Sequence, residues 1–111
     1  MRRRAGARTR DLLGQEPLLE DDSANYFGRT SKSAFQIRGN GCLALGPDRL
    51  VFVMWFPRRE LVIERSSITG VDTTRWHLGK TVGRPLLRVT FGGESAAWLV
   101  RDLSHWEAAL T

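Results

Sequence analysis

Cysteine and histidine are scarce in this 111-residue sequence, which has one cysteine, Cys42, and two histidines, His77 and His105. A single cysteine excludes a disulfide bond within the chain and suits a reducing compartment such as the cytoplasm. Structural zinc sites need about three or four cysteine, histidine or carboxylate ligands at a recognisable spacing, and the two histidines lie far apart. We therefore expect no metal ion and no cofactor, and we expect Cys42 to be a small core residue.

Long hydrophobic runs are also absent. The longest apolar run, Leu50–Phe56, is far shorter than the roughly 18 residues that cross a bilayer. No apolar segment follows the N-terminal arginines in the way that a signal peptide requires. The sequence therefore predicts a cytoplasmic chain, and the alternative left open is a peripheral protein at the inner face of the membrane.

Acidic residues are missing from the first ten positions, which hold five of the 17 basic residues: Arg2, Arg3, Arg4, Arg8 and Arg10. The chain has 12 acidic residues, so positions 11–111 carry twelve basic and twelve acidic side chains and are neutral overall. Folds that bind nucleic acid normally spread lysine and arginine over a folded face. The net charge of +5 therefore comes from the first ten residues. Nucleic acid is not a favoured partner for the rest of the chain.

Two glycine-containing motifs resemble nucleotide sites only in part. Gly39-x-Gly41-x-x-Ala44 has the letters of a dinucleotide fingerprint, but Gly46-Pro47 prevents the helix that must face the pyrophosphate. Gly79-Lys80-Thr81 has the end of a phosphate-binding loop, but Thr74 occupies the position of the required earlier glycine. The sequence pattern does not mark a nucleophile together with a general base and an orienting acid. We therefore expect no catalytic residues. An enzyme with an unrecognised site stays a third possibility, which a deep polar pocket would favour.

Residues 1–23 are expected to form a flexible leader in front of a folded domain at residues 24–111. The basic decapeptide is followed by acidic and small polar residues, which offer few core positions. Two leucine pairs, at 12–13 and 18–19, leave open whether part of the leader docks on the domain as a short helix or strand.

Short runs of β-branched and aromatic residues begin at residue 35 and are separated by glycine, proline, asparagine or aspartate, which is typical of consecutive antiparallel strands. The packed part of the domain is expected to begin near Tyr26 or Phe35. Asn40-Gly41 is the strongest hairpin signal, because both residue types tolerate positive φ. The run Leu50–Phe56 is expected to be the central strand. The predicted strands cover Phe35–Arg38, Cys42–Leu45, Leu50–Phe56, Glu60–Glu64, Val71–Trp76, Leu87–Phe91 and Ser95–Val100.

The end of the chain has a helical pattern. Asp102 can cap a helix in which Leu103, Trp106 and Leu110 share one face. A start one or two residues later, capped by Ser104, fits equally well. A helix this short is not stable alone in water, so it must pack its apolar face on the sheet.

Three stretches resemble the pleckstrin-homology-like superfamily and its GRAM branch, over roughly residues 35–111. They are Gly41-x-Leu43-x-Leu45-Gly46-Pro47-Asp48-Arg49-Leu50-x-Phe52, then Leu61-Val62-Ile63 followed by Ser66-Ser67-Ile68-x-x-Val71, and the closing Asp102–Leu110. The resemblance implies a mainly β fold, a PH-like antiparallel barrel of six or seven strands capped by one C-terminal α-helix. It also implies that ligands meet the loops or an exposed strand edge. Members that bind phosphoinositides carry several basic residues around the first hairpin, where this chain has Arg38 alone.

The candidate ligand-binding residues are basic and lie in two loops: Arg58 and Arg59 in one, Lys80 and Arg84 in the other, with Arg75 beside them. Loops at one end of a barrel can gather such side chains into a cationic rim. The alternative is that charged residues flank exposed loops only to stay hydrated and to discourage edge pairing. Trp55, Trp76 and Trp98 are expected to be core or barrel-wall residues.

These patterns favour a non-catalytic binding or scaffolding module. The first hypothesis for its partner is another protein chain or a second copy of itself. The alternative is peripheral binding of anionic lipid headgroups or nucleic acid through the basic leader and the loop rim.

Overall fold

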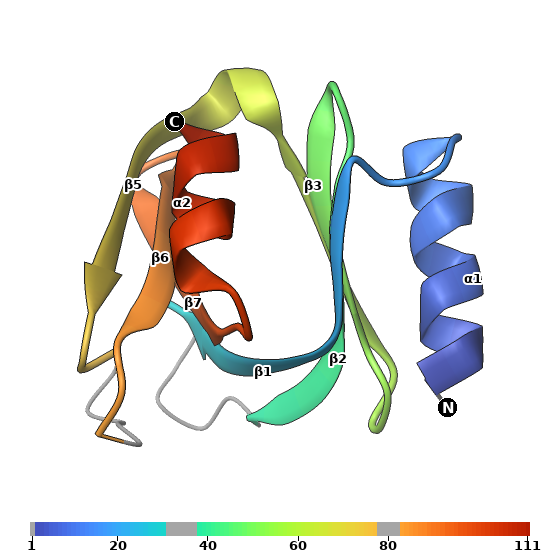
Figure 1. The fold of residues 1–111 in the computed structure, drawn as a ribbon, viewed down its shortest axis with the longest axis horizontal. Helices are drawn as coiled ribbons and strands as arrows, with labels where there is room; N and C mark the ends of the chain where they lie inside the picture. The colour runs from blue at the N-terminus through green and yellow to red at the C-terminus, as the bar shows by residue number, and fades with distance from the viewer. Residues whose placement is uncertain (1, 31–37, 78–82) are drawn as a thin grey trace.

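The computed structural model of the chain describes residues 2–30, 38–77 and 83–111. Figure 1 shows a mainly β fold with one helix near each end of the chain. The elements are α1 (Arg2–Leu13), β1 (Leu19–Arg29), β2 (Gly39–Leu45), β3 (Arg49–Met54), β4 (Arg59–Glu64), the 3₁₀ turn η1 (Arg65–Ser67), β5 (Ile68–Thr74), β6 (Leu86–Phe91), β7 (Glu94–Leu99) and α2 (Leu103–Leu110). This arrangement confirms the predicted fold class of antiparallel strands followed by a C-terminal helix.

The seven strands form one open sheet in the order β4-β3-β2-β1-β7-β6-β5. Every neighbouring pair is antiparallel, and β4 and β5 are the two edges. The middle strand, β1, pairs with β2 along its first part and with β7 along its last part, and its register shifts in both ladders. These irregularities allow β1 to bend, so that the two halves of the sheet face each other across the core (Figure 1).

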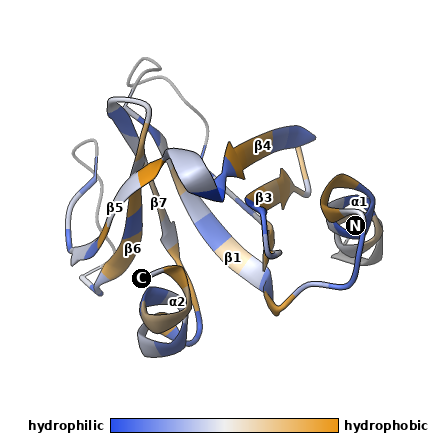
Figure 2. Cartoon of the chain, turned by 90° about the horizontal axis from the view of Figure 1, so that it is seen from above, coloured by the Kyte–Doolittle hydropathy of each residue, from blue (hydrophilic) through white to orange (hydrophobic). Residues whose placement is uncertain are grey.

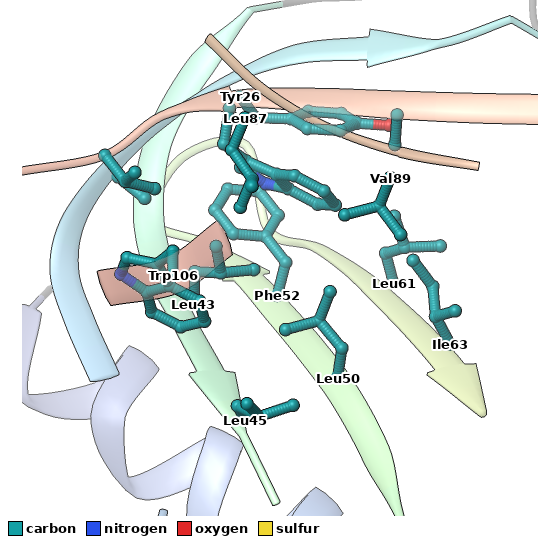
Figure 3. Packing of buried hydrophobic residues seen from close by; sticks show 14 of the residues in the cluster. Tyr26, Leu43, Leu45, Leu50, Phe52, Leu61, Ile63, Leu87, Val89 and Trp106 are labelled. Atoms are coloured by element: carbon teal, nitrogen blue, oxygen red, sulfur yellow. The ribbon is translucent and has the colours of Figure 1, made fainter. Parts of the chain in front are cut away.

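The main core fills the space between the two halves of the sheet. Tyr26, Phe52 and Trp98 meet there with ring centroids 5.1 to 5.9 Å apart. Figure 3 shows side chains of β1, β2, β3, β4, β6 and α2 pointing toward one another: Tyr26, Leu43, Leu45, Leu50, Phe52, Leu61, Ile63, Leu87, Val89 and Trp106. The aliphatic and aromatic positions of the predicted strands are therefore the residues that hold the fold together.

The expectation of a flexible leader over residues 1–23 is wrong for most of its length. Residues 2–13 form α1, and residues 19–23 begin β1, the middle strand of the sheet. Composition misled the prediction because the acidic residues of β1 have partners: the buried Asp21 accepts hydrogen bonds from the backbone N–H and the Nε of Arg101. The alternative reading, in which the leucine-bearing segments dock as a helix and a strand, is the one that the structure confirms.

Two details of the predicted sheet are corrected. The central strand is β1 and not the run Leu50–Phe56, whose first part is β3, next to the edge strand β4. Gly39-Asn40-Gly41 is not a hairpin turn but the start of β2. Glycine is needed at position 41 because the backbone of β3 comes close to it. A Cβ atom at this position would lie 2.2 Å from the carbonyl oxygen of Val53 on β3. Most of the predicted strand Phe35–Arg38 lies outside the described residues.

Other local predictions are confirmed. The turn between β2 and β3 is closed by a 2.8 Å hydrogen bond from Gly46 N to Arg49 O. Gly92 and Gly93 connect β6 to β7 with positive φ angles of 56° and 79°. In α2, the side chain of Asp102 accepts a hydrogen bond from His105 N, and Trp106 is buried in the main core.

The two helices lie on opposite sides of β2 and β3. Figure 2 shows α2 inside the curve of the sheet and α1 beyond β3 on the outer side. Beneath α1 lies a second small apolar cluster, in which Ala5 of the helix meets Cys42 and Val53 of the strands. Neither helix is long and apolar enough to cross a membrane, as judged over the described residues.

Candidate binding surface

The predicted basic rim divides into two loops. Arg58 and Arg59 are exposed in the turn between β3 and β4. Arg84 is exposed in the connection between β5 and β6, where the Nη1 of Arg75 donates a 2.9 Å hydrogen bond to Gly83 O. Lys80 lies outside the described residues.

Both loops lie at the same end of the molecule. Figure 1 shows the β3–β4 turn, the β5–β6 connection and the first turn of α1 along its lower side; we call this side the loop end. The two loops belong to opposite edges of the sheet, so the structure does not gather Arg58, Arg59, Arg75 and Arg84 into one compact cluster. A broad, flat partner is better matched to this arrangement than a small ligand.

Each of the two loops also exposes a large aromatic side chain. Phe56 follows β3 and is 74% exposed, and Trp76 follows β5 and is 62% exposed. Sequence reasoning missed both. Phe56 was taken as the end of an apolar run. The expectation that Trp76 is a core or barrel-wall residue is wrong. The signal that could have found them is their setting, since Phe56 directly precedes Pro57-Arg58-Arg59 and Trp76 directly follows Arg75.

Contacts of neighbouring residues anchor both loops. In the β3–β4 turn, Trp55 packs half-buried against the cluster beneath α1, and its backbone N–H donates a 2.9 Å hydrogen bond to Asn40 O. In the other loop, the hydroxyl of Thr74 donates to Trp76 O at 2.8 Å and accepts from Trp76 N at 3.2 Å. The Nε2 atom of the buried His77 lies 2.9 Å from Gly28 O. Phe56 and Trp76 therefore project from anchored loops.

A third group of charges joins α1 to the loop end. The guanidinium of Arg8 binds both carboxylate oxygens of Glu60, at 2.6 and 3.1 Å, and Arg58 approaches the same carboxylate at 3.5 Å. The hydrogen bonds from Arg8 hold the pKa of Glu60 below its usual value. Arg8 and Arg58 thus share the carboxylate of Glu60, and Arg59 adds a third positive charge nearby. This basic corner (Arg8, Arg58, Arg59 and Glu60) therefore keeps a net positive charge. Nothing in the sequence pattern indicates that Arg8 and Glu60 meet.

The described residues also include a thiol, potential metal ligands and a polar hollow. Burial raises the pKa of the Cys42 thiol to about 12, which makes it a poor nucleophile at neutral pH. No cluster of three potential metal ligands occurs within residues 2–30, 38–77 and 83–111. A polar hollow of about 460 Å³ lies at the end opposite the loop end, lined by Pro47, Asp48, Arg49, Glu64, Arg65 and Ser66. It contains neither a histidine nor a cysteine.

Comparison with known proteins adds information about the fold. No family model matches the chain, and no curated protein matches its sequence. A solved structure, the crystal structure of the C-terminal domain of an unknown protein from Leishmania infantum, has a TM-score of 0.62 and 17% sequence identity. The match covers 97% of this chain and 89% of that chain. The described architecture, from α1 to α2, is therefore a fold that the Leishmania domain shares.

Proposed function

We propose that this chain is a non-catalytic binding module of the PH-like type, which docks on anionic lipid surfaces through its loop end. The observation that supports this proposal best is the pairing of an exposed aromatic residue with arginines in each of two loops on one side of the molecule. Phe56 accompanies Arg58 and Arg59, and Trp76 accompanies Arg75 and Arg84. The strand order and the C-terminal helix support the PH-like assignment.

Lipid interfaces favour this combination of residues. Tryptophan is enriched at the level of the lipid headgroups, where its ring is apolar and its N–H is hydrated. Phenylalanine side chains on a membrane-facing surface enter the boundary between headgroups and acyl chains. Arginine near an anionic leaflet contributes about 1 kcal/mol per residue. The two loops lie on opposite edges of the sheet, and a bilayer is flat and wide enough to meet both at once.

The first hypothesis from the sequence, a protein partner or self-association, stays a prediction. The interfaces of stable homodimers are more apolar than the rest of the protein surface. The large exposed hydrophobic residues of the described chain are Leu18, Phe56, Val62 and Trp76, which lie in four different segments. This scatter favours a lipid surface over a protein surface for the loop end.

Vesicle co-sedimentation tests the proposal. The full chain should sediment with phosphatidylcholine vesicles that contain about 30% phosphatidylserine, and less with phosphatidylcholine alone, because anionic headgroups attract the basic loops. Binding should weaken as salt rises from about 0.05 to 0.5 M, since salt screens exposed charges. Absence of binding to anionic vesicles at the lowest salt would contradict the proposal, and recovery of a stable dimer instead would favour self-association.

Charge removal separates the loop end from the rest of the surface. Arg58→Gln with Arg59→Gln, which lowers the net charge by two, should weaken binding to anionic vesicles by about thirtyfold, from the contribution of arginine at an anionic leaflet. Ser66→Glu with Ser67→Glu is the control, because it adds negative charge in η1 at the opposite end and should weaken binding less than about threefold. Equal losses in the two variants would show that net charge alone, rather than the loop end, drives binding.

A further inference from the structure

Helix α1 covers the outer face of β2 and β3, as Figures 1 and 2 both show. Beneath it, Cys42 and Val53 are completely buried together with Ala5 of the helix. The hydroxyl of Thr9 is also buried and lies 3.7 Å from the sulfur of Cys42. Removal of α1 would therefore expose an apolar strand face that carries the only cysteine of the chain.

The side chains that α1 buries fully are small. Among residues 5–13 they are Ala5 and Thr9, while Leu12 and Leu13 are half-buried. By contrast, the shorter α2 buries Trp106. Each fully buried side chain of α1 therefore removes less apolar surface from water than the indole of Trp106 does.

Charged groups supply much of the remaining attachment. Arg8 binds Glu60 of β4 through two hydrogen bonds. Arg10 binds Glu20 at the start of β1 at 3.2 Å, and the Nη1 of Arg49 donates a 3.0 Å hydrogen bond to the carbonyl of Leu12. Ion pairs that are partly exposed weaken when another charged partner or salt competes for the same groups.

The Arg8–Glu60 pair lies where that competition would occur. It belongs to the basic corner at the loop end, which faces the lipid in the proposed function. Lipid phosphate and carboxylate groups offer Arg8 alternative acceptors in the same charge-assisted geometry. Glu60, in turn, is repelled by the anionic surface. Both effects weaken the contact between α1 and β4.

We propose that α1 is a displaceable cover, which an anionic lipid surface draws away from β2 and β3 as Arg8 exchanges Glu60 for lipid headgroups. This inference rests on the proposed function and adds a conformational step to it. The connection to β1 begins at Gly14, whose φ is 74° and whose Cβ position has no neighbouring atom within 4 Å, so packing at this residue does not oppose the movement. After displacement, the strand face around Cys42 and Val53 becomes accessible.

Alkylation of Cys42 by N-ethylmaleimide measures the displacement directly, because the chain has no other thiol. In solution the reaction should be slow, since the thiol is buried and burial raises its pKa to about 12. Vesicles with about 30% phosphatidylserine should accelerate it on the order of tenfold, whereas phosphatidylcholine vesicles should not.

Two controls separate displacement of α1 from general loosening. The first is a chain with Cys42→Ala and Ala96→Cys, which moves the thiol to a buried position of the main core on β7; its alkylation rate should not change with vesicles. The second compares Glu60→Gln with Asp72→Asn, which breaks the pair with Arg88 on the other side of the sheet. Without vesicles, Glu60→Gln should accelerate alkylation of Cys42 by about two- to fivefold and Asp72→Asn should leave it unchanged.

The outcomes distinguish this inference from the proposed function. If the chain sediments with anionic vesicles but Cys42 reacts no faster, α1 stays in place and the inference is overturned while the proposed function stands. If the chain does not sediment, the proposed function itself fails. If the thiol at position 96 accelerates as much as Cys42, vesicles unfold the whole domain and α1 is not a separate cover.

Discussion

The carboxylate of Asp21 ties the first part of β1 to the segment between β7 and α2. Asp21 is 2% exposed and accepts hydrogen bonds from Ser23 N at 2.9 Å and from Arg101 N at 2.7 Å. An acidic residue in a predicted leader is therefore a buried structural acceptor. The sequence did not show this, because the donor lies 80 positions away.

Asp21→Ala should lower the free energy of unfolding by about 1 to 3 kcal/mol, because it removes a buried charged acceptor from the part-buried N–H groups of Ser23 and Arg101. Urea unfolding measures the loss. Glu16→Ala removes an exposed partner of Arg10 and should cost less than about 1 kcal/mol. A loss for Asp21→Ala no greater than that for Glu16→Ala would mean that β1 does not depend on this contact.

Gly41 shows how one residue type can carry two different signals. Sequence reasoning took Asn40-Gly41 as a turn, because glycine permits positive φ, yet Gly41 lies in β2 where the neighbouring strand comes too close for a Cβ atom. The two reasons for a glycine cannot be separated without knowing which strands are neighbours. The local sequence shows that a glycine stands at this position, but it does not show the structural reason for it.

A pair of glycine substitutions tests this interpretation. Gly41→Ala should destabilise the domain by about 1 to 3 kcal/mol through overpacking against Val53. In Gly70→Ala on β5, the nearest atom to the added Cβ is Thr90 Cβ at 3.7 Å, an ordinary contact, so thermal or urea unfolding should show a change within about 0.5 kcal/mol. Similar effects of both substitutions would contradict close approach at Gly41.

At the scale of elements, the sequence predicted those whose signal is local. The α2 helix has its cap and its apolar stripe within ten residues. Apolar alternation marks β4 and β6, and consecutive apolar residues mark β3 and β7, between clear turns. The elements that were expected to be a flexible leader are α1 and the first part of β1. The acidic residues of β1 resemble a solvated tail unless Arg101 is placed beside Asp21. Long-range pairing, rather than propensity, decides the middle of this sheet.

Trp106 is the residue of α2 that packs deepest in the main core. Trp106→Ala should cost about 3 to 5 kcal/mol, because it removes a completely buried indole and leaves a cavity in the main core. His105→Ala on the exposed side of the same helix should change stability by less than about 0.5 kcal/mol. Urea unfolding of the two variants checks both values, and a loss below about 1 kcal/mol for Trp106→Ala would show that α2 is not part of the cooperative core.

At the scale of the whole molecule, the surface could be predicted only in part. The sequence identified Arg58, Arg59 and Arg84 as exposed cations, and the structure agrees. It did not identify Phe56 and Trp76, since exposure of an aromatic residue depends on what the rest of the chain fails to cover. Nor did it bring Arg8 to the loop end, because it treated α1 as a separate tail.

In the proposed function, the loop end of this molecule binds anionic lipid through its aromatic residues as well as its charges. The affinity of Phe56→Ser with Trp76→Ser for phosphatidylserine vesicles tests this, compared with Leu18→Ser with Val62→Ser, which removes two exposed apolar side chains from other segments. The first pair should weaken binding by at least about tenfold, from lost apolar burial, and the second pair should leave it nearly unchanged. Equal affinity of the two double variants, at the level of the parent chain, would contradict the proposed role of Phe56 and Trp76.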